Sequence, residues 1–420
     1  MSVDIFIKNA GELITLRGKN CPRTGKEMRN LGIIPDGAVI ISGGKIVSVG
    51  ETKELEKQAK RMDKIKTIDA GNKVVMPGFV DPHTHLIFAG SREHELELKL
   101  EGATYTEILK KGGGILNTVK ATRRASKREL ISSAISRLDT MLEFGTTTAE
   151  AKSGYGLTVK DEIKMLEAVR EIGHPIDVVP TFMGAHAVPP EYAGKEDVYV
   201  DLIIDKMLPE IAKRNLAEFC DVFCEKGVFT AEQSRRLLKA AKKYKLIPKI
   251  HADEMVDTGG AALAAEVGAI SAEHLLKSSQ KGLDAMAKKK VIATLLPASV
   301  FTLMLDAHAD ARYMIEKGIP VALGTDLCPN CWNESMQTII SMACYKMKML
   351  PSEAITAATI NAAYAINRGK NVGSIEIDKK ADIIVLNVPN YKQIPYRFGI
   401  NLVDKVIKNG RLVVENGKIL

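Results

Sequence analysis

Eight short apolar runs between residues 74 and 326 constrain the fold of this chain most strongly. They read VVMPGFV, GTTTAEA, IDVVPTFMGA, EFCDVFC, LIPKIHA, GAISAEH, VIATLLP and PVALGTD. Most of the gaps between them carry a helical pattern, as in VKDEIKMLEAVREIG and TAEQSRRLLKAAKKYK. Alternating strands and helices are typical of a parallel sheet, and eight repeats predict a closed (β/α)8 barrel, an α/β fold.

The two ends of the chain are rich in strand patterns instead. GAVIISGGKIVSVG near the start resembles VDKVIKNGRLVVENGKI at the end, with Gly43-Gly44 and Asn409-Gly410 as hairpin turns. Neither end has enough strands to bury a core alone. The sequence therefore predicts one small β-sandwich domain built from residues 1–74 and 373–420, and a barrel domain over residues 75–372.

Composition restricts the class of protein. Hydrophobic residues make up 45% and charged residues 26%, as in soluble globular proteins. The sequence lacks a run of eighteen apolar residues and a signal-peptide pattern, and six cysteines are too few for a disulfide scaffold, so we expect a cytoplasmic protein without a membrane partner. The net charge of +8 is scattered, which favours solubility over nucleic-acid binding and suits a small anionic substrate.

Histidines and carboxylates gather at the carboxyl ends of the predicted barrel strands. His83 and His85 close the first strand, His186 the third, His251 the fifth, His274 the sixth and Asp326 the eighth. Two histidines alone could be surface residues beside a turn. Active sites of such barrels lie at this end, however, and several imidazoles with one carboxylate suit Zn²⁺ or Fe²⁺. The pattern predicts a catalytic metal.

These residues resemble the amidohydrolase superfamily, which has H-x-H at the end of the first barrel strand. A closer resemblance is to the imidazolonepropionase family, and it covers essentially the whole chain. The blocks that carry it are PGFVDPHTHLIFAGSRE, GATYTEILKKGGGI, AKSGYG, FMGAHAVP, DVFCEKGVF, HADE and AAYAI.

The resemblance implies a site with one metal ion, Zn²⁺ or Fe²⁺/Fe³⁺. Its ligands would be His83, His85, His251 and Asp326. Binuclear relatives need a bridging carboxylated lysine on the fourth strand, which here reads FCDVFCE and contains none. The resemblance also implies a homodimer.

It further implies that Arg92, Tyr155, His186 and Glu254 contact the substrate. A guanidinium can bind a carboxylate with two hydrogen bonds, although Arg92 alone would suit a surface salt bridge. Tyr155 lies in the turn SGYG, where glycines let the backbone approach a ligand, or is an ordinary loop tyrosine.

Proton transfer is assigned to Glu254, with His274 or Asp326 assisting. Glu254 follows His251 by three residues and can reach a metal-activated water, although an exposed acid that opens the next helix is the alternative. A glutamate titrates near pH 4.3, so a general base at neutral pH would need a raised pKa. We assign His186 to stabilising the developing oxyanion.

The loop TDLCPNCW departs from the family pattern. Cys328 stands where asparagine is usual and Asn330 where glycine is usual, and Asn330 is a hypothetical replacement for the missing amide. Cys328, Asn330 and Cys331 are predicted substrate contacts. Cys328 and Cys331 also form C-x-x-C, for which a redox or soft-metal role is the alternative to reduced thiols beside a pocket.

The resemblance implies hydrolysis of 4-imidazolone-5-propanoate, a small anionic cyclic amide, to N-formimidoyl-L-glutamate in histidine degradation. One alternative is a related amidohydrolase that acts on another cyclic amide with a carboxylate, or that deaminates a purine or pyrimidine. Another is a metal-binding barrel without turnover.

Overall fold

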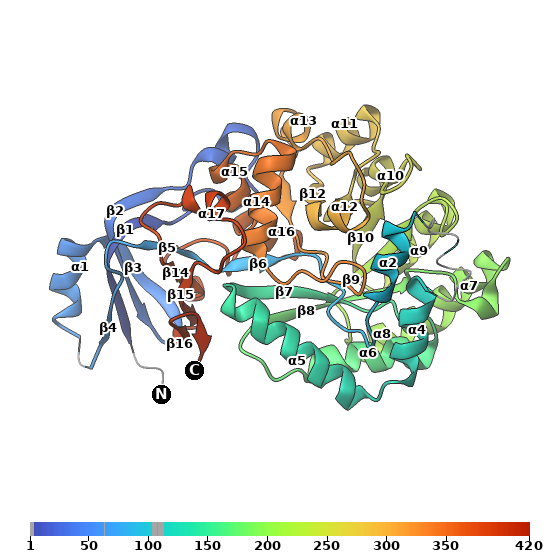
Figure 1. The fold of residues 1–420 in the computed structure, drawn as a ribbon, viewed down its shortest axis with the longest axis horizontal. Coiled ribbons are helices and arrows are strands. Elements are labelled where there is room, and N and C mark those ends of the chain that lie inside the picture. Colours follow the sequence, from blue (N-terminus) through green and yellow to red (C-terminus); the bar gives the residue numbers. More distant parts are fainter. Residues whose placement is uncertain (1–3, 63, 103–106, 108–112) are drawn as a thin grey trace.

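The computed structural model describes residues 4–62, 64–102, 107 and 113–420. The chain forms two separate sheets (Figure 1). An eight-stranded parallel sheet surrounded by helices is built from the middle of the chain. A nine-stranded sheet at one side combines the blue strands of the N-terminal part with the red strands of the C-terminal part. Residues 103–106 and 108–112 of the block GATYTEILKKGGGI lie outside the described residues.

The eight strands of the barrel are those predicted from the sequence. They pair in chain order from β6 to β13, and every pairing is parallel. The first and last strands meet just beyond their ends, where Asp326 N donates to His83 O at 3.1 Å and His85 N donates to Leu327 O at 2.9 Å. The predicted (β/α)8 architecture is confirmed. Its strands are β6 (Phe79–Asp81), β7 (Thr146–Lys152), β8 (Asp177–Ala185), β9 (Phe219–Cys224), β10 (Ile247–Ala252), β11 (Ser271–His274), β12 (Ile292–Leu295) and β13 (Val321–Leu323).

Helices cover the outside of this barrel, and several of them begin at polar capping residues. The predicted helix α6 (Val159–Glu171) starts where the Thr158 side chain accepts from Asp161 N, and it buries Met165 and Leu166. The predicted helix α9 (Ala231–Lys243) starts with a capping box of Thr230 and Gln233.

The other α-helices are α1 (Thr52–Ala59), α2 (His94–Leu100), α4 (Ile115–Arg124), α5 (Lys127–Glu143), α7 (Glu196–Leu202), α8 (Leu208–Lys213), α10 (Gly260–Val267), α11 (Gln280–Lys289), α12 (Pro297–Thr302), α13 (Ala311–Glu316), α14 (Met336–Met347), α15 (Pro351–Ala357), α16 (Ile360–Ala365) and α17 (Gln393–Tyr396). Two 3-10 turns span Gly25–Arg29 and Pro190–Tyr192, and a π-helical segment spans Ile203–Met207. None of the helices within the described residues is long and apolar enough to cross a membrane.

The nine-stranded sheet, called here the terminal sheet, joins both ends of the chain as predicted. Hairpins turn at Gly43-Gly44 and Asn409-Gly410, the expected positions. Its strands run in the order β17-β16-β15-β14-β5-β1-β2-β3, and β4 pairs with β1. Their bounds are β1 (Ile5–Ile14), β2 (Ile33–Ser42), β3 (Lys45–Glu51), β4 (Lys66–Asp69), β5 (Val74–Pro77), β14 (Ile383–Leu386), β15 (Val403–Lys408), β16 (Arg411–Glu415) and β17 (Lys418–Ile419).

The two halves of the terminal sheet enclose a common aliphatic core. Ile7, Leu13 and Val39 from the N-terminal half pack in one cluster with Ile383 and Val385 from the C-terminal half. Near β3, Ile46 N donates to Lys379 O at 3.0 Å, so the sheet curls back on itself and has a sandwich-like interior. The strands nevertheless form one hydrogen-bonded path rather than two separate layers.

The chain passes from one sheet to the other at Gly78. The sequence predicted a single strand from Val74 to Val80, but β5 pairs with β1 and β14 in the terminal sheet, and β6 starts the barrel. A Cβ at Gly78 would lie 2.3 Å from the Thr147 side chain, so only glycine fits at this crossing. We propose the domain boundaries here and between Val372, in a barrel cluster, and Ile375, in the terminal core.

Candidate active site

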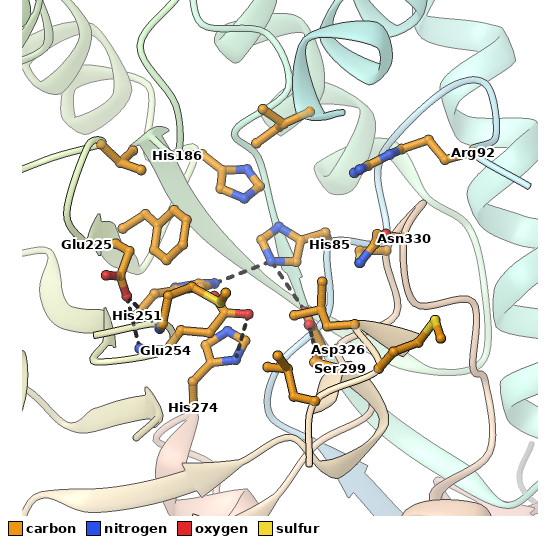
Figure 2. Close-up of a pocket in the computed structure, with 18 of the residues that line it drawn as sticks. His85, Arg92, His186, Glu225, His251, Glu254, His274, Ser299, Asp326 and Asn330 are labelled. Carbon is orange, nitrogen blue, oxygen red and sulfur yellow. Dashed lines mark hydrogen bonds and ion pairs between the residues drawn. The ribbon is translucent and has the colours of Figure 1, made fainter. Parts of the chain in front are cut away.

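The predicted metal ligands converge at the carboxyl ends of the barrel strands. Their facing atoms are Nε2 of His83, His85 and His251 and Oδ1 of Asp326 (Figure 2 shows the last three). His251 Nε2 lies 3.4 Å from His85 Nε2, and Asp326 Oδ1 lies 3.2 Å from His83 Nε2 and 3.6 Å from His85 Nε2. These side chains come from β10 and from the segments after β6 and β13.

A cation fits this arrangement. His83 Nε2 is buried and faces the Asp326 carboxylate oxygen Oδ1 at 3.2 Å. Two imidazole nitrogens that face each other at 3.4 Å cannot both keep a lone pair there without a positive charge between them. The family's metal ion would supply that charge, and three nitrogens with one carboxylate oxygen suit zinc or iron.

The electrostatics of the site also favour positive charge. Burial lowers the pKa of His83, but the carboxylates of Glu273 and Asp326 together outweigh it and raise this pKa to about 9. Burial and the neighbouring imidazoles hold the pKa values of His85 and His251 well below their usual range, so both rings are neutral at neutral pH. His83 therefore carries the proton that a cation would displace.

His274 lies as close to this cluster as the predicted ligands. It ends β11, and His83, His274 and Asp326 offer donor atoms within 4.8 Å of one another. His274 and Asp326 both adopt left-handed backbone conformations, with φ of +70° and +53°, which persist only where the surroundings hold them. His274 is thus a candidate ligand as well as the predicted proton-transfer residue.

Glu254 faces His274 from the segment after β10. Its Oε1 lies 3.6 Å from His274 Nδ1, and its side chain is 13% exposed. Its backbone is fixed because Glu254 N and Met255 N both donate to Glu225 Oε2, at 3.0 and 2.9 Å. Burial and the carboxylates of Asp326 and Glu225 raise the pKa of Glu254 to about 8. A glutamate that acts as a general base at neutral pH needs a pKa raised in this way.

A cavity of about 560 Å³ opens above these groups. Its lining includes the predicted substrate contacts Arg92, Tyr155, His186, Cys328 and Asn330. In Figure 2, Arg92 and Asn330 lie on the side away from Glu254 and His274. The size is that of a pocket for a small molecule, with basic groups to fix its orientation.

Arg92 is held in place by an internal ion pair. Its Nε and Nη2 donate to the two oxygens of Glu95, at 2.9 and 2.7 Å, and Glu95 Oε1 also accepts from Gly114 N at 2.6 Å. Glu95 therefore engages Nε and Nη2 of the guanidinium, and Nη1 lies outside this ion pair.

Comparison with known proteins settles the family. The amidohydrolase family model matches residues 74–413. An imidazolonepropionase of Alkaliphilus metalliredigens is 52% identical over 423 residues and covers 100% of both chains. One of Geobacillus kaustophilus is 53% identical over 420 residues and covers 99% of each. The chain belongs to the imidazolonepropionases of the amidohydrolase family.

Solved structures agree with this amidohydrolase in fold. A zinc-containing adenosine deaminase of Xanthomonas campestris superimposes with a TM-score of 0.72 at 17% identity and covers 100% of this chain and 94% of its own. A zinc complex of atrazine chlorohydrolase from Arthrobacter aurescens gives 0.74 at 16% identity, with 99% and 96% covered. At these identities the likeness concerns the fold alone.

In this amidohydrolase the two cysteines of the C-x-x-C motif have different surroundings. Cys328 lines the cavity, whereas the Cys331 thiol donates to Thr325 O at 3.7 Å and Cys331 is not among the described lining residues. The predicted contact between Cys331 and substrate is therefore not supported. Neither cysteine belongs to a group of three metal-ligating side chains within the described part of the chain, so the soft-metal alternative has no support either.

His186 is oriented by the turn after β7. Its Nδ1 lies 3.1 Å from Gly154 O, and an added Cβ at Gly154, where φ is +111°, would lie 2.9 Å from His186 Cβ. A carbonyl only accepts, so Nδ1 carries the proton. Burial lowers the pKa of His186 to about 4, which leaves Nε2 as an acceptor at neutral pH. In this tautomer Nε2 of the neutral ring accepts, so donation to an oxyanion, our assignment from the sequence, would require a second proton on the ring.

Two further residues of this site escaped the sequence analysis. Lys99 of α2 lines the cavity and its Nζ donates to Asn330 Oδ1 at 2.6 Å. Ser299 of α12 donates to Asp326 Oδ2 in a short hydrogen bond and so orients that carboxylate. Lys99 sits in the pattern ELELKL, which resembles any surface helix, and a lone serine carries no signal.

Proposed function

We infer that this hydrolase opens the ring of 4-imidazolone-5-propanoate and releases N-formimidoyl-L-glutamate. The observation that carries this inference is the juxtaposition, in one cavity, of a cation-binding cluster with Arg92 and Lys99, in a chain about half identical to imidazolonepropionases over its full length. The substrate has the matching parts, a cyclic amide and a carboxylate.

We propose one Zn²⁺ or Fe²⁺ ion, held by His83, His85, His251 and Asp326. When bound, such an ion lowers the pKa of a coordinated water and polarises a carbonyl. The chain would bring the substrate to this place with two cations. Arg92, through Nη1, and Lys99 would bind the propionate carboxylate, and Asn330, whose amide oxygen accepts from Lys99, would hold the lysine in position.

Glu254 would accept the proton of the attacking water. Its raised pKa makes it a stronger base than an exposed glutamate and lets it return that proton to the ring nitrogen when the C–N bond breaks. His274, 3.6 Å away, would stabilise the charge changes of Glu254. His186 Nε2, as an acceptor, would bind an N–H of the ring, and Tyr155, whose ring centroid is 5.0 Å from that of His186, would pack beside it.

We also propose a homodimer and a cytoplasmic location. An exposed apolar surface formed by Tyr345, Tyr396, Phe398 and Ile400 is consistent with a partner copy.

The test uses the purified chain, stripped of metal and reloaded with zinc or iron, and given freshly generated imidazolone propionate. We expect metal-dependent loss of the ring's ultraviolet absorbance and a product with the mass of N-formimidoyl-L-glutamate. The same ring without its carboxylate, adenine and guanine complete the substrate panel. Turnover of the purines with none of the imidazolone would replace the proposal by deamination.

A Lys99→Met variant tests the carboxylate contact. It should raise KM about 10–150-fold for imidazolone propionate and leave kcat nearly unchanged, because one charge-assisted hydrogen bond contributes roughly 1.5–3 kcal/mol. Lys53→Met, on the exposed surface of α1, is the matched control. Equal KM values in the two variants would remove Lys99 from the binding site.

A further inference from the structure

A layer of five ionisable side chains fills the barrel directly beneath the metal cluster. This charged layer consists of Glu150 and Lys152 from β7, Asp221 from β9, Lys249 from β10 and Glu273 from β11, and all five are 0% exposed. Branched aliphatic residues usually fill this space in (β/α)8 barrels. Three carboxylates and two ammonium groups here need another explanation.

The two lysines connect all three carboxylates. Lys152 Nζ lies 2.7 Å from Asp221 Oδ2, 2.8 Å from Glu150 Oε2 and 3.0 Å from Glu273 Oε2. Lys249 Nζ lies 2.7 Å from Glu150 Oε1 and 2.8 Å from Glu273 Oε1. Each ammonium therefore holds at least two carboxylates that would otherwise repel each other in a water-free interior.

The same carboxylates contact the histidines of the proposed metal site. Glu273 Oε2 is in short contact with His83 Nδ1, and Asp221 Oδ2 lies 3.1 Å from His251 Nδ1. A carboxylate at Nδ1 keeps the proton on that nitrogen and leaves Nε2 for a cation. Lys249 Nζ also donates to Pro82 O at 2.9 Å, next to His83 in the chain.

Stability does not account for this layer. Burying charges costs several kcal/mol per ion, and replacing a buried ion pair by apolar residues of similar volume is often neutral or stabilising. A layer of aliphatic residues would thus hold the barrel together as well. What such residues cannot do is fix the orientation of two imidazole rings.

We propose that Lys152 is a positioning residue, whose ammonium holds Asp221 and Glu273 so that they fix the rings of His251 and His83 with Nε2 toward the cation. Among the described lysines and arginines, Lys152 is the one with ion pairs to both of these carboxylates, which also lie 3.1 and 3.8 Å from His251 Nδ1. Without it, Asp221 and Glu273 would repel each other and the two rings would lose their common orientation. This proposal rests on the metal ligands of the proposed function.

The experiment measures metal binding without substrate. Lys152→Met and the equal-volume Asp221→Asn are compared with the parent chain by zinc competition against a chelator and by the visible spectrum of the cobalt-loaded protein. We expect the zinc Kd to rise about 10–100-fold in both variants, the usual effect of losing a residue that orients a metal ligand, and the cobalt bands to shift. With saturating zinc, kcat should fall while KM changes little.

Lys408→Met is the matched control. Lys408 is equally buried, with its side chain 1% exposed, and pairs with Asp382 at 2.7 Å and Asp177 at 2.8 Å, but it belongs to the terminal sheet. It should lower thermal stability and leave the zinc Kd and cobalt spectrum unchanged. If Lys152→Met does not fold, Asp221→Asn alone decides, because the change removes charge but no volume.

The outcomes separate this proposal from the proposed function. Zinc Kd values within twofold of the parent and an unchanged cobalt spectrum in Asp221→Asn and any folded Lys152→Met would overturn the positioning role. Weakened zinc binding in a parent chain that fails to hydrolyse imidazolone propionate would support the role and contradict the substrate. A parent chain that binds no zinc or cobalt would overturn both.

Discussion

The two sheets of this molecule enclose interiors of opposite character. In the terminal sheet, Ile7, Leu13, Val39 and Ile383 form a core with 0% exposure. In the barrel, the charged layer is equally inaccessible and lies under the metal cluster. The side chains of both interiors contact their neighbours closely. Only in the terminal sheet does the burial of every side chain add to stability.

This difference means that the terminal core serves stability, whereas the charged layer of the barrel serves function. Apolar burial contributes roughly 25 cal/mol per Å², whereas buried ion pairs contribute little net stability. A truncation in the terminal core should therefore lower the free energy of unfolding without changing the rate of the catalysed reaction. A change at the barrel site should stop the chemistry and change the free energy of unfolding less. Four predictions test this division, starting with the largest effect.

Removing the metal should have the largest effect. Chelation is expected to lower kcat/KM at least about 10³-fold, because a Lewis acid contributes several kcal/mol to the transition state and each 1.36 kcal/mol is tenfold in rate. Circular dichroism should stay unchanged, since the terminal core is independent of the ion. The control is restoration of activity by added zinc. Undiminished turnover in the metal-free chain would contradict the proposed mechanism.

Glu254→Gln should come next. Loss of the general base is expected to reduce kcat about 10²–10⁴-fold with KM nearly unchanged. The residual rate should also lose the acidic limb of the parent's pH profile, since Glu254, with its pKa raised toward 8, is the group that must lose a proton. Steady-state kinetics between pH 5.5 and 9 measure both effects. Glu54→Gln, on the surface of α1, is the control. A tenfold or smaller decrease would assign the base to another residue.

Leu13→Ala should affect the stability that the terminal core provides and leave the barrel site unchanged. Truncating this buried side chain is expected to lower the free energy of unfolding by about 2–5 kcal/mol, through lost burial and the cavity left behind. The zinc Kd and kcat of the folded fraction should stay within twofold. Val47→Ala in β3, at a position 37% exposed, is the control and should change stability by less than about 0.5 kcal/mol. A large change in kcat would show that the two interiors are coupled.

The same contrast explains what the sequence could predict. Aliphatic runs and turn residues identify the eight barrel strands and both terminal hairpins, because hydrophobic patterning and turn chemistry are local. His83 and His85 stood out because three further histidines and Asp326 stand at the ends of other predicted strands. By contrast, Lys152 and Lys249 are charged residues within strand-like runs, and their meaning depends on carboxylates from other strands.

The orientation of individual side chains could not be predicted from the sequence either. Adjacency in C-x-x-C placed both cysteines in the pocket, yet the backbone turn points Cys331 toward Thr325. The role of His186 depends on which nitrogen Gly154 engages, and that contact forms between two strands. Where a side chain points is a tertiary property, whereas the presence of a strand is a local one.

The last prediction concerns pH and the stability of the metal-free protein. The pKa of Glu254 is about 8 in the folded chain, against an ordinary value of 4.5, so folding favours its protonated form. Below pH 4.5 the residue is protonated in both states and costs nothing. Between pH 4.5 and 8 the unfolded chain releases this proton while the folded chain keeps it, so stability falls across this range and the loss is complete once the pH has passed 8.

Glu254→Gln should therefore be more stable than the parent at pH 9, by up to about 4–5 kcal/mol, with a difference of about 1 kcal/mol at pH 5.5. Urea unfolding of both metal-free proteins at the two pH values measures this. Leu13→Ala is the control, because no titratable group is changed and its difference from the parent should be the same at both pH values. A pH-independent difference for Glu254→Gln would mean that water enters the metal-free cavity and leaves the pKa near 4.5. The free-energy cost of burying the charged Glu254 carboxylate would then arise only when a ligand fills the cavity.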